Sequence, residues 1–215
     1  QTRAWSCVLL TRSSVAGNRI PRMASGSRID LTNQFLIAMP GMADETFAGT
    51  VVYLCEHNEK GALGLVINKP IDIKLKNLCE KVELTLDRED LAEAPVYFGG
   101  PVQTERGFVL HESQAGDGGH YNSTLTIPGG LEMTTSKDVL EALSKGSGPK
   151  RVLVTLGYSG WGAGQLEDEM SRNDWINVGA APEIIFNTPV EQRYERALSL
   201  LGIDPRMLSQ EAGHA

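Results

Sequence analysis

Long apolar runs and paired cysteines are both missing from this chain of 215 residues. No stretch reaches the roughly 18 consecutive apolar residues that a membrane-spanning helix needs. The three cysteines, Cys7, Cys55 and Cys79, include no C-x-x-C pair. This usage is typical of a reducing compartment and not of disulfide-stabilised secreted domains. We therefore expect a soluble, cytoplasmic protein.

Acidic residues are missing from the first part of the chain. Residues 1–22 contain no Asp or Glu, and their only charged side chains are Arg3, Arg12, Arg19 and Arg22. A basic leader is typical of an organellar transit segment, and SCVLL has the composition of a signal-peptide core, but this run is short and no A-x-A-like cleavage site follows. We favour a start codon assigned too far upstream, with Met23 as the natural first residue. We expect residues 1–22 to be a disordered leader and residues 23–215 to form one domain.

Positive charge is scarce throughout. The chain has 20 Lys and Arg residues against 27 Asp and Glu residues, a formal net charge of −7, and leaving out the four arginines of the leader takes the domain to −11. Proteins bind a phosphate backbone through clustered Lys and Arg, and no such cluster is visible. Direct nucleic-acid binding is therefore disfavoured.

Short apolar segments separated by turn residues predict three β-hairpins. Turns are expected at residues 58–61 and 128–130, where Asn, Gly and Pro gather. The segments expected to pair are residues 50–57 with 62–70, residues 94–102 with 106–113, and the two extended pieces of residues 123–135.

Helices interrupt these hairpins and do not alternate with single strands. Ser136 is a predicted N-cap, and the residues after it place Val139 and Leu143 on one helix face. One or two short helices are expected within residues 74–93, and a last long helix follows Pro189. This order predicts an α+β fold, with mixed and mainly antiparallel strands around one shared core.

One glycine-rich segment, GYSGWGAGQLEDE at residues 157–169, follows an apolar strand predicted at residues 151–156. Its glycines permit positive φ and close backbone approach, and its carboxylates suit the first turn of a helix. We interpret residues 157–164 as a turn from strand to helix that can bind an anion, present a nucleophile or simply pack.

Ser159 and His111 are weak catalytic candidates. Ser159 follows a strand, like the nucleophile of a Gly-x-Ser-x-Gly elbow, but Trp161 occupies the position of the second glycine. A hydrolase also needs a base, and the chain offers only His57, His111, His120 and His214. A serine that makes local hydrogen bonds in a turn is the favoured interpretation. We assign no catalytic residue and expect a protein that is not an enzyme.

Metal and cofactor sites are not predicted. The loop from His111 to His120 contains Glu112 and Asp117 as further ligand types, but it has neither H-x-x-x-H spacing nor a cysteine partner. The phosphate-binding motifs Gly-x-x-x-x-Gly-Lys-Ser/Thr and Gly-x-Gly-x-x-Gly are both absent. We expect a solvated loop, no metal and no cofactor.

Two glycine-rich segments are candidates for a recognition surface. GGPV at residues 99–102 and the turn at residues 157–164 place backbone N–H groups at strand ends, where they could hold an anion. Packing of backbone against backbone is favoured over phosphate binding. The residues predicted to form a ligand or partner surface are Gly99, Gly100, Pro101, Gly157, Tyr158, Ser159, Gly160, Trp161, Gly164, Gln165 and Glu167.

The order of these motifs resembles one bacterial family. The segments FLIAMPGM, GALGLVINKP, YFGGPV, RGFVLH, LVTLGYSGWGAGQLEDE, NDWI, IIF and ALSLLGID follow one another as in the YqgE/AlgH family. The resemblance runs from about Leu31 to the C-terminus. GGPV and the GYSGW/GQLEDE block are specific in combination.

The resemblance implies an α+β fold of two intertwined halves, a cytosolic location and a role as a transcriptional regulator, but no agreed catalytic residues. Our leading hypothesis is a non-enzymatic, indirect regulator that acts through a protein partner or a small anionic ligand. One alternative is a nucleotide- or anion-binding module, or a hydrolase, that uses residues 157–164. Another is a direct DNA-binding regulator.

Overall fold

Strands β1 (Gln34–Ala38) and β2 (Val51–Asn58) are apolar on both faces, which places them inside the sheet and not on its surface. Successive side chains of a strand point to opposite faces. Along β2, Val51 and Tyr53 therefore enter one apolar cluster, while Val52 and Leu54 enter another. A computed structural model describes residues 29–113 and 121–202 of the chain, and the leader at residues 1–22 lies outside them.

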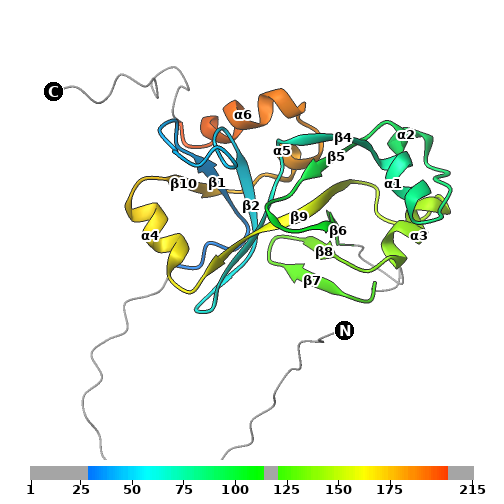
Figure 1. Cartoon of the computed structure of the whole chain (residues 1–215), viewed down its shortest axis with the longest axis horizontal. Helices are drawn as coiled ribbons and strands as arrows, with labels where there is room; N and C mark the ends of the chain where they lie inside the picture. The colour runs from blue at the N-terminus through cyan, green and yellow to red at the C-terminus, as the bar shows by residue number, and fades with distance from the viewer. Residues whose placement is uncertain (1–28, 114–120, 203–215) are drawn as a thin grey trace, which may run out of the picture.

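Within the described residues ten strands form one strongly curled sheet with the order β10-β1-β2-β3-β9-β6-β8-β7, and β4 and β5 join it at the side of β9 (Figure 1). The remaining strands are β3 (Gly61–Val66), β4 (Pro70–Lys74), β5 (Pro95–Phe98), β6 (Val102–Glu112), β7 (Thr124–Ile127), β8 (Leu131–Thr134), β9 (Val152–Gly162) and β10 (Trp175–Gly179). Their pairing is antiparallel except between β5 and β9. The predicted α+β class with mainly antiparallel strands is confirmed.

Strand β9 joins the two halves of the molecule. Its C-terminal residues, Ser159 to Gly162, pair with β3, while its N-terminal residues, Val152 to Leu156, pair with β6. In Figure 1 this strand crosses the centre of the molecule between the two halves. A residue on β9 therefore belongs to one half or the other according to its position along the strand.

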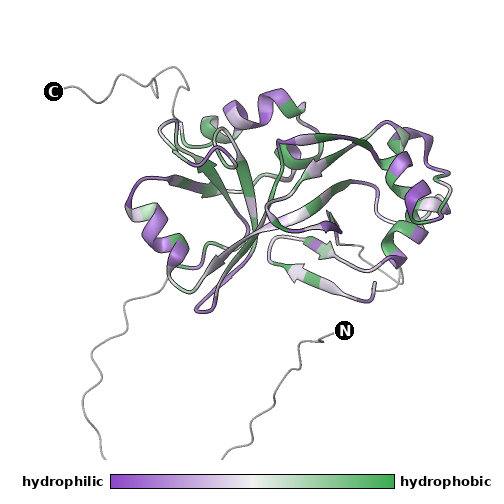
Figure 2. Cartoon of the chain, viewed as in Figure 1, coloured by the Kyte–Doolittle hydropathy of each residue, from purple (hydrophilic) through white to green (hydrophobic). Residues whose placement is uncertain are grey.

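Short helices cover the sheet and bury its apolar faces (Figure 2). Helices α5 and α6 cover the face that contains Phe35 and Tyr53, α4 covers the opposite face around Leu54 and Trp161, and α1 and α3 pack in the other half around Val154. No helix in the described part of the chain is long and apolar enough to cross a membrane. The helices are α1 (Leu75–Lys81), α2 (Glu89–Ala92), α3 (Asp138–Ser144), α4 (Gln165–Ser171), α5 (Pro182–Phe186), the 3₁₀ helix η1 (Val190–Gln192) and α6 (Arg193–Ser199).

Two of the three predicted hairpins are present. Asn58 pairs with Gly61 at the β2–β3 turn, and β7 pairs with β8. The predicted pairing of residues 94–102 with 106–113 is wrong, because β5 pairs with β4 and lies parallel to β9, and β6 pairs with β8 and β9. The sequence signal at Gly99 to Pro101 does not join a hairpin, because β5 has one partner earlier in the chain, β4, and a second partner, β9, more than 50 residues further along.

The predicted turn at residues 157–164 is also corrected by the structure. Hydrogen bonding to β3 continues to Gly162, so β9 runs through most of the glycine-rich segment. Only Ala163 and Gly164 turn the chain into α4, and Gly164 has the positive φ, +77°, that the turn requires. Glycine content alone predicted a turn, but pairing with a neighbouring strand kept the segment extended.

Candidate functional site

Gly99, Gly100 and Gly157, which we call the glycine junction, pack backbone against backbone at the centre of the sheet. A Cβ atom on Gly99 would lie 2.1 Å from the carbonyl oxygen of Gly157, and one on Gly157 would lie 2.4 Å from the carbonyl oxygen of Gly100. These distances leave no room for any side chain. The structure thus brings the two predicted glycine segments together, but they fill each other's space.

Ser159 is held inside this junction. Its side chain is fully buried, with 0% of its surface exposed, and its hydroxyl donates a hydrogen bond of 3.0 Å to the carbonyl oxygen of Gly99. The same oxygen accepts the N–H of Val66 at 2.9 Å. The hydroxyl therefore ties together the ends of β3, β5 and β9. This role is structural, as the sequence favoured, but the bond joins distant segments and Ser159 lies in a strand, so the predicted local bond in a turn is wrong.

His111 lies in the other half of the molecule and does not reach Ser159. It pairs with Val152, seven residues from Ser159 along β9, a separation of about 23 Å for an extended strand. Its Nδ1 is 2.9 Å from the carbonyl oxygen of Glu112, and its Nε2 is 2.9 Å from Thr134 Oγ1. The two catalytic candidates do not form a nucleophile–base pair, and His120 lies outside the described residues.

Trp161 and Trp175 fasten α4 to the sheet through Glu169, and Gln165 adds a bond to the same carboxylate within the helix. The carboxylate of Glu169 accepts the indole N–H of Trp161 at 2.8 Å, the indole N–H of Trp175 at 2.9 Å and the amide of Gln165 at 2.9 Å. The Tyr158 ring packs edge-on against Phe108. Pro101, Gly160, Gly164 and Glu167 are the members of the predicted surface that face outward with Gln165.

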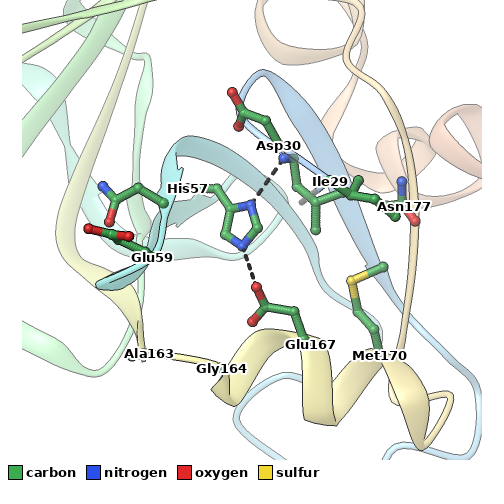
Figure 3. A pocket seen from close by; sticks show the side chains of 11 residues that line it. Ile29, Asp30, His57, Glu59, Ala163, Gly164, Glu167, Met170 and Asn177 are labelled. Carbon is green, nitrogen blue, oxygen red and sulfur yellow. Dashed lines mark hydrogen bonds and ion pairs between the residues drawn. The ribbon is translucent and has the colours of Figure 1, made fainter. Parts of the chain in front are cut away.

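A cavity of about 890 Å³ opens beside α4 (Figure 3). Its walls come from the segment before β1, the β2–β3 turn, the turn into α4, α4 itself and β10. The lining residues are Ile29, Asp30, Leu31, His57, Asn58, Glu59, Ala163, Gly164, Glu167, Met170 and Asn177. Only Gly164 and Glu167 of the predicted surface are among them.

His57 is fixed at the wall of this cavity by two hydrogen bonds. Its Nδ1 accepts the backbone N–H of Leu31 at 3.1 Å, so the neutral ring carries its proton on Nε2, which donates to Glu167 Oε1 at 3.1 Å (Figure 3). The His57 side chain is 5% exposed and that of Glu167 is 55% exposed. A buried ring therefore positions a carboxylate that stays open to solvent.

The cavity is negatively charged. Asp30, Glu59 and Glu167 line it, and its described lining includes no Lys or Arg. Hydrogen bonds from the side chain and then the backbone N–H of Thr32 lower the pKa of Asp30, and His57 adds a smaller effect in the same direction. Asp30 is therefore ionised at neutral pH, and the cavity favours a cation or a hydrogen-bond donor over an anion.

Sequence reasoning missed most of this site. His57 was considered only as a base for Ser159, and no sequence pattern pointed to Asp30 or Asn177. The contact between His57 and Glu167 could not be predicted, because 110 residues separate them and they meet only after folding. One usable signal was a histidine at the end of an otherwise apolar strand, TVVYLCEH. In the described residues, no three His, Cys, Asp or Glu side chains are grouped to hold a metal ion.

Comparison with known proteins gives consistent matches over almost the whole chain. A family model described as AlgH-like matches residues 35–206. A UPF0301 protein of Ralstonia nicotianae is 69% identical over 187 residues, which are 87% of this chain and 96% of that protein. A UPF0301 protein of Burkholderia ambifaria is 66% identical over 188 residues, 87% of this chain and 97% of that protein.

Two solved structures share the fold. The solution structure of the AlgH protein from Pseudomonas aeruginosa matches with a TM-score of 0.71 and 48% identity, covering 90% of this chain and 100% of that one. The crystal structure of protein DIP2367 from Corynebacterium diphtheriae matches with a TM-score of 0.62 over 80% of this chain and 88% of that one. At 21% identity, the second match shows the fold alone.

Proposed function

This chain belongs to the AlgH-like family, and on that premise we propose that it is a non-enzymatic cytoplasmic protein that regulates transcription indirectly, by binding a protein partner or a small ligand in the cavity beside His57. One observation carries the proposal. The cavity is lined by three carboxylates, and its described lining contains no Lys or Arg. We therefore replace the anionic ligand expected from the sequence with one that presents an ammonium or guanidinium group.

The hydrogen bonding of Glu167 supports a cationic ligand. His57 Nε2 donates to Oε1 of Glu167, and this bond orients the carboxylate while leaving Oε2 available as an acceptor. Hydrogen bonds between charged partners are about twice as strong as neutral ones. Leu31 and Met170 add apolar surface that suits an alkyl stem. These features support an amine on an aliphatic chain as the ligand.

The closed glycine junction supports a binding role over catalysis. Gly99, Gly100 and Gly157 offer no open cradle for a phosphate, and the Ser159 hydroxyl is buried and bonded to Gly99. A nucleophile needs a base within hydrogen-bond reach, and His111 is far from it. The hydrolase and nucleotide-binding alternatives therefore lose the residues on which they relied.

Titration with two small probes of matched length tests the cavity. We expect n-pentylammonium, followed by NMR of backbone amides, to shift the signals of His57, Gly164 and Asn177, and n-pentanoate to leave them unchanged. Glu167→Gln removes one charge and should weaken amine binding about tenfold, the loss of one charge-assisted hydrogen bond. Glu195→Gln, an equal change at an exposed position on α6, should leave binding unchanged.

Two results would contradict the proposal. Equal or tighter binding of n-pentanoate would show that the site selects anions. Sequence-specific DNA binding by the isolated protein in the nanomolar range at physiological salt would show that regulation is direct, since this is the affinity range of true operator binding.

A further inference from the structure

On its outer edge β10 has no neighbouring strand in the part of the chain that the structure describes. Within the described residues β10 pairs only with β1, and the bonds from Met39 N to the carbonyl oxygen of Asp174 and from Ala180 N to that of Asn33 fix which residues face β1. Because the bonding direction alternates along an antiparallel strand, Ile176 and Val178 bond to β1. The N–H and C=O groups of the alternate residues, Trp175, Asn177 and Gly179, point away from the sheet.

This edge lacks three of the features with which proteins block edge strands. These are charged side chains, proline and bulges. The β10 sequence, WINVG, contains no charge and no proline, and its register with β1 is uninterrupted. The strand is therefore able to accept another strand beside it.

The open edge is continuous with the negatively charged cavity. Asn177 belongs to β10 and lines the cavity, and α4, which carries Glu167 and Met170, leads directly into β10. Alternate side chains of an added strand would lie on the same sheet face as the Asn177 side chain. Long basic side chains can lay their stems on Met170 and direct their charged heads toward Glu167.

We propose that β10 binds an extended basic segment of a protein partner by strand addition, with alternate Lys or Arg side chains directed to the cavity. The proposal rests on the proposed function and names the partner class of that same site. Main-chain hydrogen bonds supply affinity in this mode of recognition, and pockets for alternate side chains supply specificity. A basic partner also complements the charge of this protein, because the cavity and the domain as a whole are acidic.

Proline substitution tests the main-chain part directly. Asn177→Pro removes an outward N–H and leaves the bonds from Ile176 and Val178 to β1 in place, as proline is tolerated on edge strands whose N–H faces solvent. Asn177→Ala is the matched control, because it also loses the side-chain bond to Gln34 but keeps the N–H. Gly179→Pro removes the neighbouring outward N–H and gives a second test.

The probe is a fluorescein-labelled decapeptide of alternating threonine and lysine, compared with its threonine–glutamate counterpart by fluorescence anisotropy. We expect the lysine peptide to bind at least tenfold more tightly to Asn177→Ala than to either proline variant. We expect it to slow amide hydrogen exchange at Trp175, Asn177 and Gly179 in the unmodified chain. Unchanged exchange at Ile176 and Val178 in the variants shows that β10 still pairs with β1.

Several results would overturn strand addition. These are equal binding to the alanine and proline variants, equal binding of the glutamate peptide, no binding of the lysine peptide, or protection at the β7 edge and not at β10. If n-pentylammonium binding still depends on Glu167 in such a case, the cavity function stands and only the β10 proposal fails. If neither probe binds, both proposals fail.

Discussion

The glycine junction and the cavity beside His57 lie at the two ends of one segment, the last part of β9 and the start of α4, and they differ in almost every respect. At the junction, backbone atoms of Gly99 and Gly157 fill the space completely. At the cavity, carboxylates surround open space. The junction is the more conspicuous feature of the sequence, whereas the cavity is the region with open space.

This difference shows that a glycine-rich motif indicates close approach of some group to the backbone but does not identify that group. A glycine is required wherever a ligand or another part of the backbone comes near. Here the approaching group is the chain itself, so the motif serves folding. Substitutions at the junction should therefore change stability, and substitutions at the cavity should change binding.

The largest effect is expected from Gly100→Ala. Gly100 has a φ of +150°, and an added Cβ would lie 2.2 Å from the carbonyl carbon of Tyr158. We expect the free energy of unfolding in urea to fall by about 3 to 5 kcal/mol, the range of the most disruptive single substitutions. Gly41→Ala, where no atom lies within 4 Å, should change it by less than about 0.5 kcal/mol. A small effect at Gly100, combined with loss of amine binding, would reverse the roles of the two regions.

A smaller effect, about 2 kcal/mol, is expected from Glu169→Gln, because the charged acceptor for the indoles of Trp161 and Trp175 is lost. Since α4 also carries Glu167, this variant should lower both stability and amine affinity, with a shift in tryptophan fluorescence. Asp168→Asn, an exposed neighbour on α4, is the control and should leave all three unchanged. Normal amine affinity in Glu169→Gln would mean that the cavity does not depend on how α4 is fastened.

Ser159→Ala should cost about 1 kcal/mol, the loss of one neutral buried hydrogen bond, and should leave amine binding unchanged. The same change at Ser199, an exposed residue whose hydroxyl bonds the carbonyl oxygen of Glu195, should have a smaller effect. The unmodified protein should not react with a serine-directed fluorophosphonate. Labelling that disappears in Ser159→Ala would restore the nucleophile hypothesis.

Among these four variants, Glu167→Gln should change stability least, although it should weaken amine binding. Glu167 is 55% exposed, and pairs with exposed partners contribute little, so Glu167→Gln should change the free energy of unfolding by less than about 0.5 kcal/mol. Urea unfolding of this variant, measured beside its amine titration, separates the two properties. A large loss of stability would mean that the His57–Glu167 bond is mainly structural.

Local signals were sufficient for much of the fold. Alternation and turn residues placed β2 and β3 and their turn at Asn58, and periodicity placed α3. The predicted cap was wrong, because the N-cap of α3 is Lys137 and not Ser136, and no side chain caps the helix. The same signals failed where a strand chose a distant partner, as β5 did in lying parallel to β9. They also failed at residues 157–162, where strand pairing overrode the turn tendency of glycine. Prediction was reliable where the determining contacts were close in sequence.

The candidate site was less predictable than the fold. Glu167 was selected for its place beside the glycines, and it does line the cavity, but its partner His57 and the neighbouring Asp30 come from the other end of the domain. The glycine and serine residues that looked most like a site turned out to be packed against each other. A motif identifies residues that are constrained, and it does not show whether a ligand or the protein constrains them.

By itself the sequence determined the fold class, the acidic charge of the domain and the resemblance to a family, because composition, periodicity and motif order are properties of the chain in one dimension. Only the tertiary structure decided that β9 continues through the glycines, that the junction is closed and that His57 meets Glu167 beside an open cavity. The physical reason is that open space and charge clustering depend on which distant segments pack together. Local propensity carries no information about either.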